Sequence, residues 1–323
     1  MVKTEGSTAR STGREYTEEM QKHKGYLADL SANRTIYAMA LPAVVFLLLF
    51  AYWPTLGVVL AFKNYSFAEG ILGSPWVGLS NFREIFDSPF FVRAVRNSLI
   101  ISFMKLLVGF PFPIIIALLL NEIKLRAVKK AVQTVTALPY FISWVVLGGI
   151  VISILSPSGG IINEVLVLLG KEPINFMVEN RWFRWILVAS DIWKNAGWGA
   201  IIYLAALAGI DPQQYESAMM DGANRWKQLI HITLPGLTGT IAVLLILNMG
   251  WILSAGFEQV YLLYNAAVYD SADIIETYLL RTGLSEGRFD LATAIGLFQS
   301  VVGCIMLFTV NGIVRRMGKS GVF

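Results

Sequence analysis

Side chains that could perform acid–base or metal chemistry are sparse in this sequence. The nearest candidates for an acidic cluster of the kind that a metal-dependent transfer enzyme needs are Asp270, Asp273 and Glu276. Neither histidine lies near this group, and the single cysteine, Cys304, excludes both an internal disulfide and a zinc centre built from several cysteines. The sequence therefore predicts no catalytic residue, no metal site and no cofactor bound by this chain.

A nucleotide site is not expected either. Gly318-Lys319-Ser320 resembles the end of a phosphate-binding loop, but Ile313 occupies the position five residues earlier where that loop needs glycine. The sequence also lacks a nucleophile elbow, a paired-histidine zinc motif and a dinucleotide fingerprint. Any energy-requiring work by this protein would therefore draw its energy from another chain.

Polar side chains inside apolar stretches form a second chemical group, suited to contact with a polar solute. Asp191, Asn195 and Trp198 follow the i, i+4, i+7 spacing of one helix face, and a similar face begins at Asn248. Two alternatives stay open: Asp191 pairs with Lys194 along the helix, or the amides bond across helices and the rings form an interfacial belt. The candidate pathway residues are Asp191, Asn195, Trp198, Asn248, Trp251, Ser254, Glu258 and Tyr261.

The surrounding chain has the composition of a membrane protein. Of its 323 residues 55% are apolar and 15% are charged, against about 25% charged in a soluble domain. Its mean hydropathy is +0.60, and a membrane-crossing helix needs about 20 mostly apolar residues. The sequence predicts an all-α integral membrane protein with six transmembrane helices, at about 36–62, 98–120, 131–155, 182–207, 232–257 and 291–314.

An even number of spans places both termini on one side of the membrane. With the N-terminus inside, the inner segments are denser in Lys and Arg than the longer outer segments, as expected for cytoplasmic loops. The sequence thus predicts cytoplasmic tails at 1–35 and 315–323. The net charge of +4, without a long basic block, argues against a nucleic-acid partner.

The inner loop 209–235 carries the most specific pattern. Asp211 followed by Pro212 is an N-cap and first-turn pair that begins a helix, and Gly222 is expected to end it in a left-handed conformation. Asn224 can cap a second short helix, which Pro235 follows. The loop is too apolar to be merely solvated, so it is either a helical hairpin packed on its own membrane domain or a docking knob for a soluble partner.

This loop resembles the EAA loop of permease subunits in binding-protein-dependent ABC importers. The resemblance rests on Glu216-Ser217-Ala218, Asp221-Gly222-Ala223 and Ile232-Thr233-Leu234-Pro235 at the family's spacing, with Ser217 and Leu229 departing from its commonest residues. It implies a type I ABC importer permease architecture, in which this loop seats a coupling helix in a cleft of a cytoplasmic ATPase. The implied coupling residues are Tyr215, Glu216, Ser217, Ala218, Met219, Asp221, Gly222, Ala223, Trp226 and Leu229.

The resemblance covers nearly the whole chain. The segments 73–79 and 203–207 are similar to the larger permease of maltose-type sugar importers, and 273–278 resembles a branch that carries polygalacturonate-, aldouronate- and alginate-type oligosaccharides. It implies a non-catalytic permease in the bacterial inner membrane that imports an oligosaccharide by ATP-driven alternating access. The pathway residues suit a sugar, because amides match its polar edges and indole rings match its C–H faces.

The resemblance also implies a set of partners. They are a second homologous permease, two cytoplasmic ATPase subunits that carry ATP and Mg²⁺, an extracytoplasmic solute-binding protein, the oligosaccharide and membrane lipid. The long outer segments 63–97 and 258–290 are expected to receive the solute-binding protein; the alternative is that they simply cap the helices.

Two other functions compete with this interpretation. A secondary transporter would need intramembrane ionisable groups as ion sites and often has inverted repeats, whereas the sequence shows one intramembrane charge pair and no clear repeat. A membrane-embedded glycosyltransferase would need an acidic or metal-binding cluster, for which Asp270, Asp273 and Glu276 are the nearest candidates.

Overall fold

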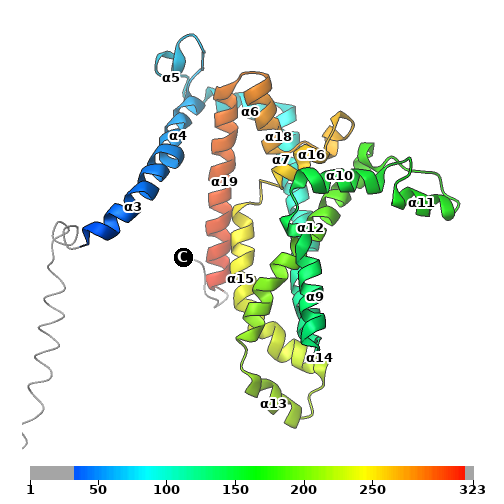
Figure 1. Ribbon diagram of the computed structural model, residues 1–323. Coiled ribbons are helices and arrows are strands. Elements are labelled where there is room, and N and C mark those ends of the chain that lie inside the picture. The colour runs from blue at the N-terminus through cyan, green and yellow to red at the C-terminus, as the bar shows by residue number, and fades with distance from the viewer. Residues whose placement is uncertain (1–32, 317–323) are drawn as a thin grey trace, which may run out of the picture. The chain divides into compact units, whose positions relative to one another are not determined.

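The computed structural model describes residues 33–316, so most of the two predicted tails, 1–35 and 315–323, lies outside the described residues. Within 33–316 the chain is helical, and its one strand-like feature is an isolated bridge between Lys63 and Trp76 (Figure 1). The predicted all-α class is confirmed. The chain divides into two compact units, the first ending at Val59 and the second beginning at Leu60.

The first unit contains a long apolar helix. α3 (Arg34–Leu47) continues through a π-helical turn, η1 (Leu48–Tyr52), and α4 (Trp53–Thr55) into η2 (Leu56–Phe62). No residue in the most apolar part of this helix is buried. A helix that is apolar all round is typical of a membrane span that faces lipid or another subunit.

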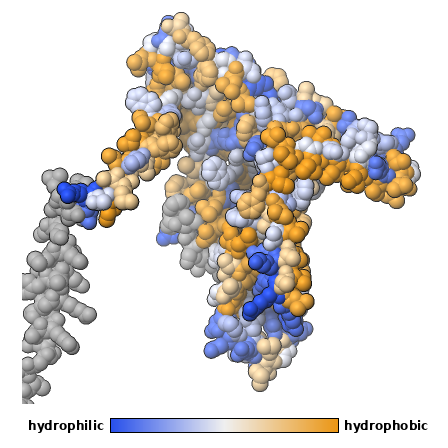
Figure 2. Space-filling model, viewed as in Figure 1, coloured by the Kyte–Doolittle hydropathy of each residue, from blue (hydrophilic) through white to orange (hydrophobic). Residues whose placement is uncertain are grey.

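The second unit is organised around two helix pairs. The 29-residue α12 (Asn180–Ala208) packs along α8 (Pro111–Glu122), and α15 (Leu234–Gly250) packs on α19 (Phe289–Arg316). Figure 2 shows hydrophilic residues gathered near α13 and α14, at one end of this unit, beyond a broadly hydrophobic surface. That distribution is the one expected for a membrane-embedded bundle with a water-facing inner end.

The other helices of this unit connect or cover those pairs. They are α5 (Gly70–Gly73), α6 (Ser80–Asp87), α7 (Pro89–Met104), η3 (Lys105–Gly109), α9 (Arg126–Ala137), η4 (Leu138–Phe141), α10 (Trp144–Leu155), α11 (Ile161–Leu168), η5 (Phe176–Val178), α13 (Pro212–Met220), α14 (Arg225–Gln228), η6 (Leu229–Thr233), α16 (Phe257–Leu263), η7 (Ala266–Val268), α17 (Tyr269–Ala272), α18 (Ile275–Leu280) and η8 (Arg281–Ser285). Three buried apolar clusters hold them together, around Phe183, Phe91 and Tyr203.

Two prolines follow π-helical turns without ending their helices. η3 precedes Pro111, and η6 precedes Pro235. The prediction of a separate short helix between Asn224 and Pro235 is wrong, because one continuous helix runs over Arg225–Gly250. Proline lacks an N–H and crowds the carbonyl four residues earlier, and the wider π turn directly before it accommodates both effects.

The third predicted span is a bent pair of helices. The segment Arg126–Phe141 meets Trp144–Leu155 at 102°, so the expectation of a single helix over 131–155 is wrong. Pro139 lies in the last turn before the bend, and the Ser143 hydroxyl accepts a hydrogen bond from Val146 N at the start of α10. One helix therefore ends and the next begins within these residues.

The described residues contain most of the helices expected to cross the membrane. Within the described residues, four helices are long and apolar enough to cross a membrane, or five if the bent pair is one span. α12 has the length of a sixth span, but Asp191, Lys194 and Asn195 reduce its hydropathy. The six spans remain a prediction for which these helices are the candidates.

Candidate functional site

A cavity of about 530 Å³ opens between α7, η3, α8, α12, α15 and the segment that follows α15. This volume lies within the usual range for a small-molecule site. Six of the eight predicted pathway residues line it: Asp191, Asn195, Trp198, Asn248, Trp251 and Ser254. The structure thus brings together the predicted polar faces of α12 and α15.

Hydrogen-bonding groups and flat rings both line the cavity wall. The Asn195 amide donates to Asp191 Oδ1 over 3.1 Å, and the Asn248 amide donates to the Leu244 carbonyl over 2.7 Å. The indole of Trp198 stacks on the ring of Tyr140 with centroids 4.7 Å apart. Such a wall offers polar contacts beside apolar faces, as a sugar requires.

The charge partner of Asp191 differs from the predicted one. Its Oδ1 lies 3.4 Å from Nζ of Lys105, the first residue of η3, and not beside Lys194. Lys194 instead donates to the carbonyls of Tyr140, at 3.0 Å, and Ile142. The expected Asp191–Lys194 pair is therefore wrong, because the bend before α10 exposes carbonyls that bind the lysine more directly.

Lys105 lines the cavity and was not singled out by the sequence analysis. Its ammonium donates to the Ala255 carbonyl over 2.9 Å and to Gln259 Oε1 over 2.5 Å. Together with Asp191 these acceptors match the three donors of an ammonium group. The sequence contains one signal for its importance: Lys105 is a lone cation in an apolar stretch. A charged side chain in such a stretch costs free energy unless it has partners.

The segment that Lys105 holds is an interruption between α15 and α16. Within residues 33–316, Ala255 is the one non-glycine residue with a positive φ, 52°, and Gly256 follows at 85°. A Cβ at Gly256 would lie 2.6 Å from Lys105 Nζ. On the other side, the Ser254 hydroxyl donates to Glu276 Oε1 over 2.9 Å. The backbone that carries Trp251 and Ser254 into the cavity is therefore held by two contacts, one from Lys105 and one to Glu276.

The remaining two predicted pathway residues do not line the cavity. Glu258 and Tyr261 lie on α16, directly after the interruption, and both are exposed. α16 places Val260 and Leu263 in the core, so its exposed side carries these two residues instead.

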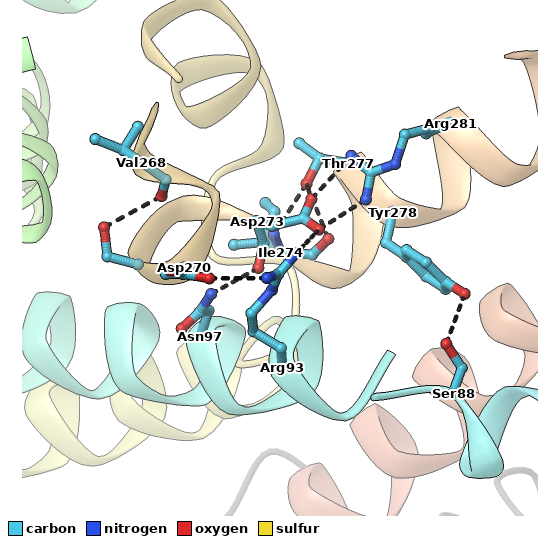
Figure 3. A network of polar contacts seen from close by, with 11 residues as sticks. Ser88, Arg93, Asn97, Val268, Asp270, Asp273, Ile274, Thr277, Tyr278 and Arg281 are labelled. Carbon is cyan, nitrogen blue, oxygen red and sulfur yellow. Dashed lines mark hydrogen bonds and ion pairs between the residues drawn. The ribbon is translucent and has the colours of Figure 1, made fainter. Parts of the chain in front are cut away.

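Two of the three acidic residues that an enzyme would need, Asp270 and Asp273, are engaged by arginines (Figure 3), and the third, Glu276, accepts hydrogen bonds from Ser254 and Gln299. Asp273 is fully buried and accepts hydrogen bonds from both terminal nitrogens of Arg281, at 3.3 and 2.7 Å. Arg93 reaches Asp270 over 2.8 Å and Asp273 over 3.8 Å. Within the described residues, no group of three or more potential metal ligands occurs. This arrangement fastens α7 to α17 and α18, which is a structural role.

The predicted inner loop forms two short helices joined by a glycine turn. Asp211 Oδ1 accepts a hydrogen bond from Gln213 N, and Asn224 Oδ1 accepts one from Lys227 N, each at 2.9 Å. Gly222 has a φ of 74°. Both predicted caps and the left-handed glycine are confirmed, although α13 ends slightly earlier, at Met220.

The ten predicted coupling residues divide into an exposed and a partly buried group. Half-buried positions are Tyr215, Ala218, Ala223 and Leu229, and the Tyr215 hydroxyl lies 3.0 Å from Oγ1 of Thr233, the last residue of η6. The exposed positions are Glu216, Ser217, Met219, Asp221, Gly222 and Trp226. The first group fixes the loop to its own helix, and the second leaves an apolar and acidic surface open at the inner end.

Comparisons with known proteins agree with this architecture. A family described as binding-protein-dependent transport system inner membrane component matches residues 109–319. The polygalacturonan/rhamnogalacturonan transport system permease protein YteP of Bacillus subtilis (strain 168) is 44% identical over 303 residues, 94% of either chain. Protein LplB of the same organism is 42% identical and covers 92% of this chain and 94% of its own.

Two solved structures share the fold. One is a bacterial ABC transporter involved in the import of the acidic polysaccharide alginate, with a TM-score of 0.85, 43% identity, and coverage of 91% of this chain and 99% of the other. The second is a bacterial alginate ABC transporter in complex with an alginate pentasaccharide-bound periplasmic protein, with the same TM-score and identity, and coverage of 92% and 99%. The chain belongs to the family of inner membrane components of binding-protein-dependent transport systems, and it is a non-enzymatic ABC importer permease.

Proposed function

We propose that this permease moves oligosaccharides, with acidic, uronate-containing chains as the expected class, from a solute-binding protein into the cytoplasm. The observation that carries the proposal is the joint placement of cavity and loop: α12 and α15 both line the cavity, and both lead into the exposed loop formed by α13 and α14. The relatives named above support the substrate class, since one carries polygalacturonan in its name and another was solved with alginate.

The helix over Arg225–Gly250 gives the loop a direct mechanical connection to the cavity. It begins next to the glycine turn and ends just after Asn248. At 1.5 Å per residue, a rigid helix of this length carries a displacement of the loop over about 39 Å. Two ATPase subunits, which would hold ATP and Mg²⁺, would move the loops of this chain and of a second permease together, and hydrolysis would reset them.

The charge of the cavity is compatible with an acidic sugar. Among the cavity-lining residues of the described chain, the charged ones are Lys105 and Asp191, and they lie against each other. Their charges offset, so a uronate does not meet an unpaired carboxylate. A secondary transporter is not favoured, because Lys105, Asp191 and Lys194 are engaged in contacts within the chain and none is left as an ion site.

The test is reconstitution of this chain with a second permease, two ATPases and a solute-binding protein in vesicles. We expect the binding protein loaded with a uronate oligosaccharide to stimulate both ATP hydrolysis and uptake, and a carboxyl-reduced analogue to do so less. Uptake by this chain alone, or uptake that continues when the ATPase site is blocked, would refute the importer assignment. Equal stimulation by both sugars would refute only the acidic class.

A further inference from the structure

A row of four aromatic rings runs along α16 and onto the next helix. Phe257, Tyr261 and Tyr264 occupy i, i+4 and i+7, and the ring of Tyr269 follows. Successive centroids are 5.4, 6.0 and 5.3 Å apart, with interplanar angles of 30°, 36° and 21°. Tyr261 is exposed and the other three rings are half-buried, so the row keeps part of its surface open.

The row connects the cavity to the outer network. Its inner end, Phe257, directly follows Gly256, which lines the cavity. Its other end, Tyr269, lies under the guanidinium of Arg281 at 5.2 Å, and that guanidinium is fixed by Asp273. In Figure 1 this part of the chain lies beyond the end of α15 that is opposite α13 and α14. The row therefore spans the stretch between the predicted outer side and the cavity.

We propose that these rings form a track along which an oligosaccharide passes from the outer side to the cavity. The proposal rests on the importer function above and names the chemistry that guides the sugar: pyranose C–H faces lie against the rings, and hydroxyls bond to the tyrosine edges. The ring spacing is comparable with the length of one sugar unit. A continuous row can thus hand an extended chain from ring to ring without one strong binding site.

One side of α16 packs on the core, and part of the ring row stays accessible: Phe257 and Tyr264 pack partly against the buried cluster around Phe183, whereas Tyr261 is exposed. Val260, Leu263 and Gln259 already fill its buried faces, with Gln259 bonded to the Leu187 carbonyl and to Ser190 at 2.7 Å each. The side chain of Tyr261 is 45% exposed in the middle of the row. Burial raises the pKa of Tyr264 to about 12, so its hydroxyl stays an uncharged donor at physiological pH.

The test compares Tyr261→Leu, Tyr261→Phe and Trp185→Leu in the complete transporter. Trp185 is a matched control: it is 52% exposed, on the outer part of α12 and outside the row. The measurement is the KM for uptake of the shortest and the longest oligosaccharide that the wild-type complex imports. We expect Tyr261→Leu to raise the KM for the longest substrate about three- to tenfold, with little change for the shortest. Tyr261→Phe keeps the ring, so its KM for the longest substrate should stay close to that of the wild type.

Each other outcome has a definite meaning. The track would be overturned by any of three results: Tyr261→Leu raises the KM equally for short and long substrates, Trp185→Leu raises the KM as much as Tyr261→Leu does, or Tyr261→Leu leaves the KM unchanged. The rings would then be an interfacial belt or part of the packing. A wild-type complex that imports no oligosaccharide would overturn the importer function itself. The two failures are therefore distinguishable, because only the second appears in the unmodified protein.

Discussion

Lysine side chains in the apolar part of this chain bind backbone carbonyls where helices are interrupted. Lys105 holds the carbonyl of Ala255 between α15 and α16, and Lys194 holds those of Tyr140 and Ile142 at the bend before α10. Carbonyls at an interruption have no intrahelical partner, and in lipid an unsatisfied one is costly. The lysines thus stabilise irregular backbone that shapes the cavity.

If Lys105 and Asp191 stabilise the fold as a pair, their single and double variants should differ in stability in a defined way. Lys105→Met should lower the stability of the purified complex by about 1–3 kcal/mol, because it leaves polar groups of Ala255, Gln259 and Asp191 without their donor. Lys105→Met combined with Asp191→Asn should lose less than the sum of the two single variants. Thermal unfolding measures all three, and strictly additive losses would contradict the pairing.

Replacement of Glu276 by glutamine is expected to stabilise the protein by an amount that depends on pH. Burial raises the pKa of its carboxyl above the usual 4.5, and within the described residues its buried Oε2 has no hydrogen-bond partner. The folded state therefore favours the protonated form, and stability falls as pH rises from 4.5 through the raised pKa. Glu276→Gln keeps the acceptor for Ser254 and should raise the melting temperature at pH 7 more than at pH 5. An equal shift at both pH values would contradict this assignment.

At the scale of elements, the loop of α13 and α14 depends on the backbone conformation of its glycine turn as well as on its exposed side chains. A Cβ at Gly222 would meet no atom within 4 Å, so the cost of substitution there comes from the left-handed φ of 74°. For a residue with a side chain that conformation costs about 1–2 kcal/mol. The turn is consequently sensitive to backbone strain even where space is free.

Gly222→Asp should abolish uptake and the coupling of ATP hydrolysis to transport while membrane insertion stays intact. The substitution strains the turn and adds a charge to the surface proposed to enter the ATPase cleft. Gly222→Ala should have a smaller effect, and Gly239→Ala is the control, since Gly239 also has free space around it but no positive φ. Wild-type transport by Gly222→Asp would contradict the docking role of this loop.

Features that depend on residues close together in the chain could be predicted from the sequence. The caps at Asp211 and Asn224, the turn at Gly222 and the shared face of Asp191, Asn195 and Trp198 each depend on neighbours within a few residues. The partners of Lys105 and Lys194 are more than 50 positions away in the chain, and their choice depends on the 102° bend and the interruption at Ala255. These are tertiary contacts, which spacing along one helix does not specify.

At the scale of the whole molecule, the question is whether the inner loop and the cavity move together. α12 enters the loop through 209–211, and Arg225–Gly250 leaves it, so both cavity walls begin where the ATPase is proposed to act. The interruption at 251–256, tied by Lys105 and by Glu276, is where motion of α15 would be converted into a change of cavity access. Transport then depends on coupling across the full height of this unit.

This coupling predicts that a thiol in the cavity reports on the nucleotide state. In a Cys304→Ser background, which removes the one native cysteine, Ser254→Cys should react with a water-soluble thiol reagent added outside at a rate that changes severalfold when the partner ATPases bind ATP. Adding Gly222→Asp should remove that change without altering the rate in the nucleotide-free complex, because the cavity is intact and only its link to the ATPase is lost. Glu69→Cys, exposed in the outer segment 63–97, is the control and should react equally in all states. A nucleotide response that persists in the Gly222→Asp variant would show that motion reaches the cavity by a route other than this loop.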